Sequence, residues 1–200
     1  LVELCKMYGV EIIMNQDVSK IKVDNNNAKK VYTNTEIYEA DIMISNADYA
    51  FTEIHLLDKE YQTYPPSYWE KREIAPSAFI IFLGITGKLN KLLHHNYYFP
   101  LDWDDHFETI AKGATLPFDP LIYFSCTSKT DMSVAPPDHE NMFITVAIPP
   151  GIVISEEEKK KYTEHIIKKL ERYSGEQIEK NIITQTIFIT YTYFYWTNIA

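Results

Sequence analysis

The run "SAFIIFLGI", residues 77–85, constrains the fold of this chain more than any other stretch of its sequence. It is rich in β-branched and aromatic residues, and it is far shorter than the roughly 20 residues that a membrane-spanning helix needs. A run of this length and content is typical of a buried strand. The 200 residues of the chain suffice to build a core around it, because a chain of this size buries roughly 70% of its unfolded surface on folding.

Further strands are expected on both sides of this run, each short and rich in β-branched or aromatic residues. Before it, the turn "DNNNA" predicts a short antiparallel meander, because Asn tolerates the left-handed backbone of hairpin turns. The apolar residues from Val18 to Val23 do not alternate strictly, which predicts a bulge near Lys20. The strands that we expect cover residues 10–15, 17–24, 29–34, 36–48, 77–85, 96–99, 121–126, 141–148 and 183–192.

Helices are expected between these strands, so the chain is predicted to be of the α+β class. Ser155 and Glu158 have the spacing of a capping box, which marks the start of a helix. An apolar stripe follows and Gly175 closes it, so this helix is predicted to end at residue 174. The shorter helices that we expect cover residues 1–8, 48–57 and 102–112, with Asp48 and with Asp102 or Asp104 near the starts of the last two.

Composition excludes several classes of function. A net charge of −9 and a pI near 5.1 argue against nucleic-acid binding, which needs clustered Lys and Arg. Cys5 and Cys126 lack the spacing of a zinc or redox motif and are expected to be free thiols in a reducing cytoplasm. The adjacent His94 and His95 point to opposite faces of a strand, so no metal site is expected.

No complete catalytic or cofactor motif stands out in these residues. Ser125 and Cys126 end an expected strand upstream of His139, but no nucleophile-elbow signature accompanies them. The six glycines do not form the loop that binds a pyrophosphate. The residues by themselves therefore leave the function open.

Several longer motifs resemble one enzyme family. "ADIMISNADYAFTEIHLL" is similar to the family segment "ADxVxSNADxxxxxxxLL", and "LLHHNYYF" and "TDMSVAPPDHENMF" are similar to its "LxHHxxxF" and "TDxSxAPxGHENxF". The family is that of the bacterial carotenoid desaturases, the phytoene desaturase flavoproteins, and the motifs occur in its order over residues 1–188. Pro137 and Asp138 stand where the family usually has an acid and Gly, which leaves the geometry of that turn open.

The resemblance implies an architecture of two parts. Residues 1–57 are expected to form part of an FAD-binding domain of the amine-oxidase type. Residues 58–188 are expected to form a substrate-binding domain built on a mixed β-sheet with flanking helices. The family's Gly-rich fingerprint has no counterpart here, so the chain is expected to be an internal fragment. After Phe188 the sequence departs from the family, and residues 189–200 are expected to be an atypical tail.

The resemblance also implies residues of a cofactor site. In "QDVSKI", Val18 corresponds to a residue whose backbone bonds the adenine of FAD. Ser45, Asn46 and Ala47 correspond to a turn beside the FAD phosphates or ribose. The alternative for these four residues is ordinary strand-end and helix-cap chemistry.

The substrate that the resemblance implies is a C40 carotenoid such as phytoene. A hydrocarbon of this kind offers no group to hydrogen-bond and needs a long apolar tunnel. Phe79, Ile81 and Leu83, on one face of the strand at 77–85, are expected to line this tunnel together with Tyr123. Core packing is the alternative for each of them.

The reaction implied is desaturation, in which a hydride leaves a saturated carbon for the flavin, a proton leaves its neighbour and a C=C bond forms. No catalytic residue is assigned, because the residues beside the flavin ring would come mostly from segments without a counterpart here, and the isolated chain is expected to be inactive. One alternative is a non-enzymatic remnant that binds hydrophobic ligands without flavin. Another is a related flavin oxidoreductase, such as a retinol saturase, a carotene isomerase or an amine oxidase-like enzyme.

Because carotenes dissolve in the bilayer, the whole enzyme is expected to be cytoplasmic with peripheral contact to the membrane. The stretch around residues 58–76 is polar and aromatic, and its aromatic residues beside Lys71 and Arg72 suit a headgroup interface. A plain surface loop is the alternative. The aromatic residues in question are Tyr61, Tyr64, Tyr68 and Trp69.

Overall fold

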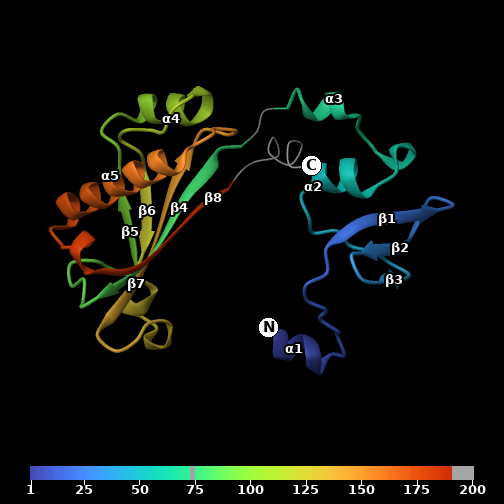
Figure 1. Ribbon diagram of the computed structural model, residues 1–200, viewed down its shortest axis with the longest axis horizontal. Helices are drawn as coiled ribbons and strands as arrows, with labels where there is room; N and C mark the ends of the chain where they lie inside the picture. Colours follow the sequence, from blue (N-terminus) through green and yellow to red (C-terminus); the bar gives the residue numbers. More distant parts are fainter. Residues whose placement is uncertain (73–74, 191–200) are drawn as a thin grey trace. The chain divides into compact units, whose positions relative to one another are not determined.

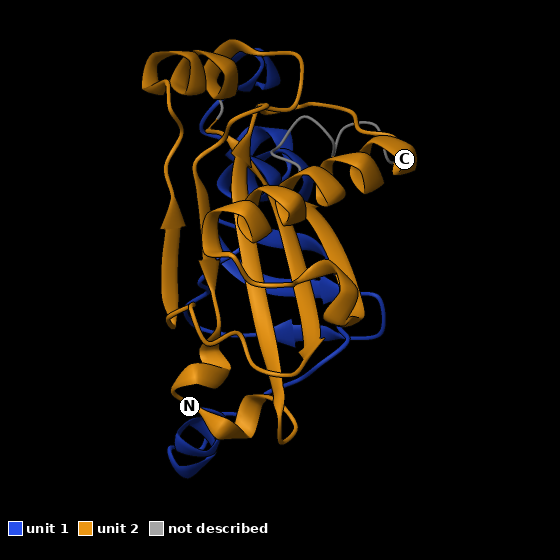
Figure 2. Cartoon of the chain, turned by 90° about the vertical axis from the view of Figure 1, so that its left-hand side faces the viewer, with its two compact units in different colours: residues 1–73 blue, residues 74–200 orange. Residues whose placement is uncertain are grey.

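The computed structural model describes residues 1–72 and 75–190. It divides the chain into two compact units, residues 1–73 and 74–200 (Figure 2). Each unit contains helices and one antiparallel sheet, which confirms the predicted α+β class.

The division falls later than the boundary expected after Leu57. Residues 58–72 belong to the first unit, and five hydrogen bonds from Gln62, Thr63 and Tyr64 tie them to the helical segment before them and to the residue that follows it. The side-chain amide of Gln62 donates to the backbone oxygen of Leu57 over 3.2 Å, and the backbone N–H of Thr63 donates to Glu53 Oε2 over 2.6 Å. The prolines and aromatic residues of this stretch are thus compatible with a packed segment as well as with a linker.

The first unit contains a three-stranded antiparallel sheet of β1 (Val18–Asp24), β2 (Asn27–Thr33) and β3 (Ile37–Glu39), in this order (Figure 1). Asn25 and Asn26 form the two-residue turn between β1 and β2, with φ values of 49° and 59°. Asn tolerates this left-handed conformation, so the meander forms where the turn chemistry predicts it. The pairing of β1 with β2 shifts its register between Val18 and Lys20, which confirms the predicted bulge.

The helical segments of the first unit are short. Asp48 Oδ1 accepts a hydrogen bond from the backbone N–H of Phe51 over 2.8 Å, which confirms Asp48 as a helix cap. The segments are α1 (Val2–Met7), α2 (Tyr49–Phe51), a π-helical turn Thr52–Leu56, a 3₁₀ turn Lys59–Tyr61 and α3 (Pro66–Trp69).

Two expected strands of this unit are wrong in whole or in part. Residues 10–15 form no strand, and the strand expected over 36–48 is limited to β3, which ends at Glu39. Both stretches have the local composition of a strand, but a strand also needs a neighbour that pairs with its backbone. Within residues 1–72 no strand pairs with 10–15 or 40–48.

The second unit is built on a five-stranded sheet in the order β5-β6-β7-β4-β8, made of β4 (Ser77–Thr86), β5 (His95–Tyr98), β6 (Ile122–Ser125), β7 (His139–Ile148) and β8 (Ile182–Thr190). Its neighbouring strands are antiparallel in every described pair, so the expectation of a mixed sheet is wrong for this part of the chain. The first residues of the expected tail, Ile189 and Thr190, continue β8. Residues 191–200 lie outside the described residues.

One face of this sheet is covered by α5 (Glu156–Ser174), as Figure 2 shows. The rings of Phe79 on β4 and Tyr162 on α5 meet edge to face, with centroids 5.1 Å apart. Ile166 and Leu170 of the same helix join the sheet residues in one hydrophobic core. The other helical segments of this unit are α4 (Trp103–Lys112), capped by Asp102, and 3₁₀ turns at Thr127–Lys129, Met132–Val134 and Glu179–Asn181.

The turn before β7 contains a residue with a left-handed backbone conformation. Asp138 has a φ of 57° and accepts a hydrogen bond at its backbone oxygen from the N–H of Gly87 over 2.8 Å. This is the position at which the resembled family usually has Gly. Asp adopts the left-handed region more readily than most residues, so the turn forms without Gly.

Candidate functional site

One candidate site lies in the first unit, just before the helical segment that Asp48 caps. A cavity of about 220 Å³ there is lined by Val18, Ser45, Asn46 and Ala47, the four residues expected to contact a cofactor. Val18 comes from the start of β1, and the other three come from the segment that follows β3. The structure therefore brings all four around one cavity, whose remaining walls are the apolar residues Ile21, Val31, Met43, Ile44 and Leu56.

The backbone around this cavity is open to a ligand. Outside the sheet, no backbone hydrogen bond between described residues involves residues 41–47. Ser45 Oγ lies 2.8 Å from Thr52 Oγ1, and this hydrogen bond ties the segment to the helical turn behind it. Apolar side chains on the walls and unpaired backbone groups on one edge suit a flat ring with a polar rim. The volume is below the roughly 300–1,000 Å³ typical of small-molecule pockets, so the cavity accommodates part of a larger ligand.

The sheet of the second unit presents a second candidate site on the face opposite α5. Phe82 of β4 pairs with Phe143 of β7 and with Thr186 of β8, so these three side chains share that face. The rings of Phe82 and Phe143 are 5.3 Å apart, and Phe188 approaches Phe82 at 5.8 Å. Phe82 remains 43% exposed and Phe188 56% exposed. Within the described residues this face is thus an aromatic surface with little cover.

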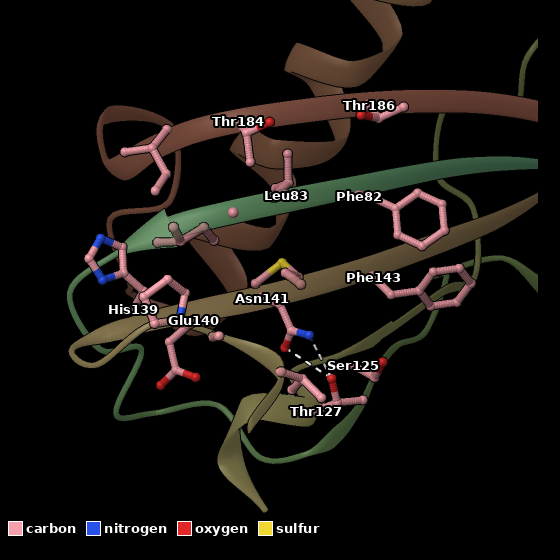
Figure 3. Close-up of a pocket in the computed structure, with 17 residues that line it drawn as sticks. Phe82, Leu83, Ser125, Thr127, His139, Glu140, Asn141, Phe143, Thr184 and Thr186 are labelled. Atoms are coloured by element: carbon pink, nitrogen blue, oxygen red, sulfur yellow. Dashed lines mark hydrogen bonds between the residues drawn. The ribbon is translucent and has the colours of Figure 1, made fainter. Parts of the chain in front are cut away.

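A cavity of about 630 Å³ lies on this open face, as Figure 3 shows. Phe82 and Phe143 line one part of it, and Asn141 and Thr184 line another (Figure 3). A third part is lined by Val134, at the end of the 3₁₀ turn before β7, and by Ala135 and Pro136, which follow it. His139 and Glu140 line the cavity as well, so it combines aromatic rings with a small number of polar and titratable groups, as ligand pockets usually do.

Of the four expected substrate residues, Leu83 is among the residues that line this cavity, and Phe79, Ile81 and Tyr123 are not. Phe79 and Ile81 are fully buried beneath α5, and Leu83 is 3% exposed, so their side chains belong to the core. Tyr123 pairs with Thr145 and lies on the open face. The expectation that all four line one wall of a tunnel is therefore corrected: three lie on the covered face and one on the open face. Both faces of β4 are apolar, so the sequence pattern did not show which one α5 covers.

The sequence pattern did not identify the residues that line the open face, because both faces of β4 are apolar. Phe82 alternates with the expected residues along β4, and Phe143 pairs with Phe82 from β7. The signal that distinguishes the two faces of β4 is Gly84, which interrupts the row of apolar side chains on the open face only. Asn141 of β7 pairs with Gly84, so a polar residue lies beside the point where the apolar row is interrupted.

The Ser125, Cys126 and His139 group does not form a nucleophilic site. Burial raises the pKa of the Cys126 thiol to about 12, and the negative charge of Glu140 acts in the same direction. The thiol therefore stays neutral and unreactive at physiological pH. His139 Nδ1 donates to the backbone oxygen of Pro137 over 2.7 Å instead of contacting either candidate nucleophile.

Three of the four aromatic residues expected at a membrane interface, Tyr64, Tyr68 and Trp69, contact one another. Tyr64 and Tyr68 stack with centroids 4.0 Å apart, and Trp69 meets Tyr49 edge to face at 5.2 Å. Arg72 lies over the ring of Tyr68 at 4.8 Å. Each of the expected aromatic residues is half-buried. No helix within residues 1–72 and 75–190 combines the length and the apolar content needed to cross a bilayer.

Comparisons with known proteins define the class of the chain. No family model matches it. Its fold is similar to that of an oxidoreductase from Methanosarcina mazei, with a TM-score of 0.56 and 16% identity over 94% of this chain and 40% of that one. A structure from Pyrococcus furiosus gives a TM-score of 0.60 and 17% identity over the same shares. The fold is thus shared with part of a solved oxidoreductase, and the sequence relatives are oxidoreductases as well.

The chain belongs to the family of carotenoid and phytoene desaturases. It is 33% identical to a carotenoid 3,4-desaturase of Haloarcula japonica over 94% of this chain and 38% of that protein. It is also 33% identical to a 1-hydroxycarotenoid 3,4-desaturase of a Flavobacterium species, over 74% of this chain and 30% of the relative. A phytoene desaturase of Myxococcus xanthus is 29% identical over 74% of this chain and 28% of its own length. The chain therefore spans less than half the length of the curated relatives that it matches.

Proposed function

We propose that this chain is a portion of an FAD-dependent carotenoid desaturase, in which the second unit contributes a binding face for a polyene and the first unit contributes one wall of the cofactor site. The observation that carries the proposal is the open aromatic face of the second sheet in a chain whose relatives act on carotenoids. The residues of the covered face serve as core and are not part of the proposed site.

The open face suits a long hydrocarbon. Phe82, Phe143 and Phe188 form a continuous group of rings along three neighbouring strands. A polyene has no group that demands a hydrogen bond, so its affinity comes from the apolar area that it buries. Tyr97 and Tyr123 extend the aromatic surface across β5 and β6, with ring centroids 5.1 Å apart. The cavity of about 630 Å³ falls within the usual range for ligand pockets and accommodates one end of such a molecule.

The cavity in the first unit fits one part of FAD. Apolar residues such as Ile21 and Leu56 suit the faces of a purine ring, and the unpaired backbone groups of residues 45–47 suit its edge or the ribose hydroxyls. Val18 contributes the opposite wall. When bound, the flavin supplies the hydride acceptor of the desaturation. The role of the described residues in this proposal is to bind and orient, and no general base is assigned among them.

The proposed polyene site is tested by titrating the purified full chain with an acyclic C40 polyene hydrocarbon in detergent micelles. The shift of the polyene absorption band reports binding. We expect the parent chain to bind, and Phe82→Ala to weaken binding roughly tenfold because it removes a central ring of the face. Phe107→Ala is the matched control, because Phe107 is also an exposed phenylalanine, 57% exposed against 43% for Phe82, and lies on α4 outside the residues that line the cavity. A parent chain that binds no polyene, or a Phe82→Ala variant that binds as tightly as the parent, would refute the proposed site.

A non-enzymatic module that binds hydrophobic ligands without flavin is the second candidate function. The small volume of the cavity in the first unit, about 220 Å³, favours it. Absorbance of the purified chain near about 450 nm after incubation with FAD decides between the two, because bound flavin absorbs there. Retention of the flavin band after gel filtration supports the enzyme portion. A colourless chain that still binds the polyene supports the module.

A further inference from the structure

The two edges of the five-stranded sheet differ in how they are protected. β5 forms one edge, is four residues long and is followed closely by Pro100. Short strands and prolines are two of the means by which natural sheets avoid pairing with other chains at an edge. β8 forms the other edge, is nine residues long and pairs with β4 alone among the described strands (Figure 1). This second edge is long enough to pair extensively with a further strand.

The sequence of β8 lacks the features that usually protect an edge strand. No Asp, Glu, Lys, Arg or Pro occurs in Ile182–Thr190, and Ile183 and Phe188 are 60% and 56% exposed. The one register shift in its pairing with β4 lies at its first residues, so residues 184–190 pair regularly. Alternate N–H and C=O groups of this regular part point away from β4 and have no strand partner among the described residues.

Charge favours a second copy of the chain as the partner of this edge. The net charge is −9, so two copies repel each other wherever acidic surfaces would meet. Pairing β8 with itself places no charged side chains opposite each other, because residues 182–190 carry none. Ile, Thr and Phe, which make up most of the strand, are also residues that form favourable cross-strand pairs.

Symmetry fixes how the faces of two such sheets would meet. A two-fold axis that relates two antiparallel edge strands is perpendicular to the sheet, so both copies present the same face to the same side. Thr184, Thr186 and Phe188 lie on the open face, since they pair with Gly84, Phe82 and Ile80. The residues that alternate with them, such as Ile187 and Ile189, pack against the core on the covered face. Each face of β8 would thus continue into the same face of the second copy.

We propose that β8 pairs antiparallel with β8 of a second copy, which joins the two five-stranded sheets into one sheet with a continuous open face. This inference goes beyond the proposed function, since it does not depend on whether a polyene binds. The assembly stops at two copies, because the remaining edges are the short β5 strands. The paired strands bury a small interface, so we expect a dissociation constant in roughly the micromolar range.

Sedimentation velocity of the full chain without detergent tests the proposal over about 1–100 μM, a range chosen around this dissociation constant. We expect the mass to rise with concentration from 23.4 kDa to twice that value. Hydrogen–deuterium exchange at the same concentrations should show that the β8 peptide gains protection as the dimer forms. A chain that stays monomeric, grows beyond two copies, or dimerises without added protection of β8 would overturn the proposal.

Thr186 allows a test by charge. It is exposed, and in any two-fold pairing centred on residues 185–187 it lies opposite or diagonal to its own counterpart. Thr186→Lys and Thr186→Glu should each weaken the dimer roughly tenfold or more, because like charges then meet across the two strands. An equimolar mixture of the two variants should dimerise again, and native mass spectrometry should show the mixed pair.

The matched controls are Thr115→Lys and Thr115→Glu, because Thr115 is exposed and lies between α4 and β6, away from the β8 edge. Both should dimerise as the parent does. Single Thr186 variants that dimerise like the parent, or a mixture of folded variants that stays monomeric, would refute the pairing. Circular dichroism shows whether each variant is folded, and the exchange measurement on the parent decides the question even where a variant is not.

Discussion

Glu140 is a buried residue whose contacts hold in place the segment that positions Asn141 in the candidate site. Its carboxylate is 2% exposed and accepts a hydrogen bond from Ser128, and Lys129 Nζ lies 2.7 Å from its Oε1. Lys129 also donates to the backbone oxygen of Leu89 over 2.6 Å. These contacts fix the segment after β6 against β7, and the same segment supplies the Thr127 hydroxyl that positions Asn141.

Replacing this carboxylate is expected to destabilise the second unit. Glu140→Gln should lower the free energy of unfolding by about 2 kcal/mol at neutral pH, because Lys129 loses its charged partner while it remains largely buried. Urea denaturation followed by circular dichroism measures this change. Glu179→Gln is the control, since Glu179 is exposed, and it should change stability by less than about 0.5 kcal/mol. Equal stability of the two variants would contradict the assigned role.

The contribution of Glu140 to the stability of the second unit is expected to depend on pH. Burial by itself would raise the pKa of Glu140, but the hydrogen bonds from Lys129 and Ser128 and the nearby positive charge outweigh it, so the pKa is lowered from 4.5 in the folded chain. A lowered folded pKa contributes stability that is present above the unfolded value and is lost as the pH falls through the folded value. The difference in stability between the parent and Glu140→Gln should therefore shrink as the pH is reduced below 4.5.

Among the elements, α5 illustrates a helix whose limits are encoded locally. Ser155 Oγ accepts from the backbone N–H of Glu158 over 3.2 Å, and Glu158 Oε2 accepts from the N–H of Ser155 over 2.9 Å. Gly175 ends the helix with a φ of 68°, a conformation that costs Gly little. Between these ends the helix buries Tyr162, Ile166 and other apolar residues against the sheet. The element that covers one face of the sheet, and so leaves the other as the candidate site, thus begins and ends at residues visible in the sequence.

The capping box makes a prediction for this element. Ser155→Ala removes an acceptor from the first turn of α5 and should lower the free energy of unfolding by about 1 kcal/mol. The measurement is the urea midpoint of the second unit's transition. Lys160→Ala, an exposed change in the same helix, should leave the midpoint nearly unchanged. If the two variants unfold at the same urea concentration, the cap contributes no stability.

At the scale of the whole molecule, the two units differ in how much apolar surface they bury. The hydrophobic core formed by the described residues lies within the second unit, where strands and α5 contribute to one continuous cluster. The buried apolar residues of the first unit, among residues 1–72, are Val23, Ala50 and Leu56. Local stability follows burial and backbone protection, so the two units are expected to open with different free energies.

Hydrogen–deuterium exchange measures this difference directly. We expect the amide groups of β4 and β7, which pair along ten residues each, to exchange roughly tenfold or more slowly than those of β1 and β2. Mass spectrometry of peptides from the full chain resolves the two sheets in one experiment. Equal protection of both sheets would show that the first unit is as stable as the second, in spite of its smaller core.

The sequence by itself determined the features that depend on near neighbours along the chain. The α+β class, the turn at Asn25 and Asn26, the bulge near Lys20 and the limits of α5 all follow from turn, strand and capping chemistry within a few residues. The family motifs were visible for a related reason, because they are short contiguous stretches, and the homology to carotenoid desaturases confirms them.

Only the tertiary structure decided which segments pair, which face is covered and which residues meet. Residues 10–15 look like a strand but pair with no strand among the described residues, and β4 is apolar on both faces, of which α5 covers one. Ser125, Asn141 and Thr184 are distant in sequence and become neighbours only through the order of the strands. The pairing of strands and the packing of a helix on one face of a sheet are interactions between segments far apart in the chain. No local sequence pattern therefore predicts them.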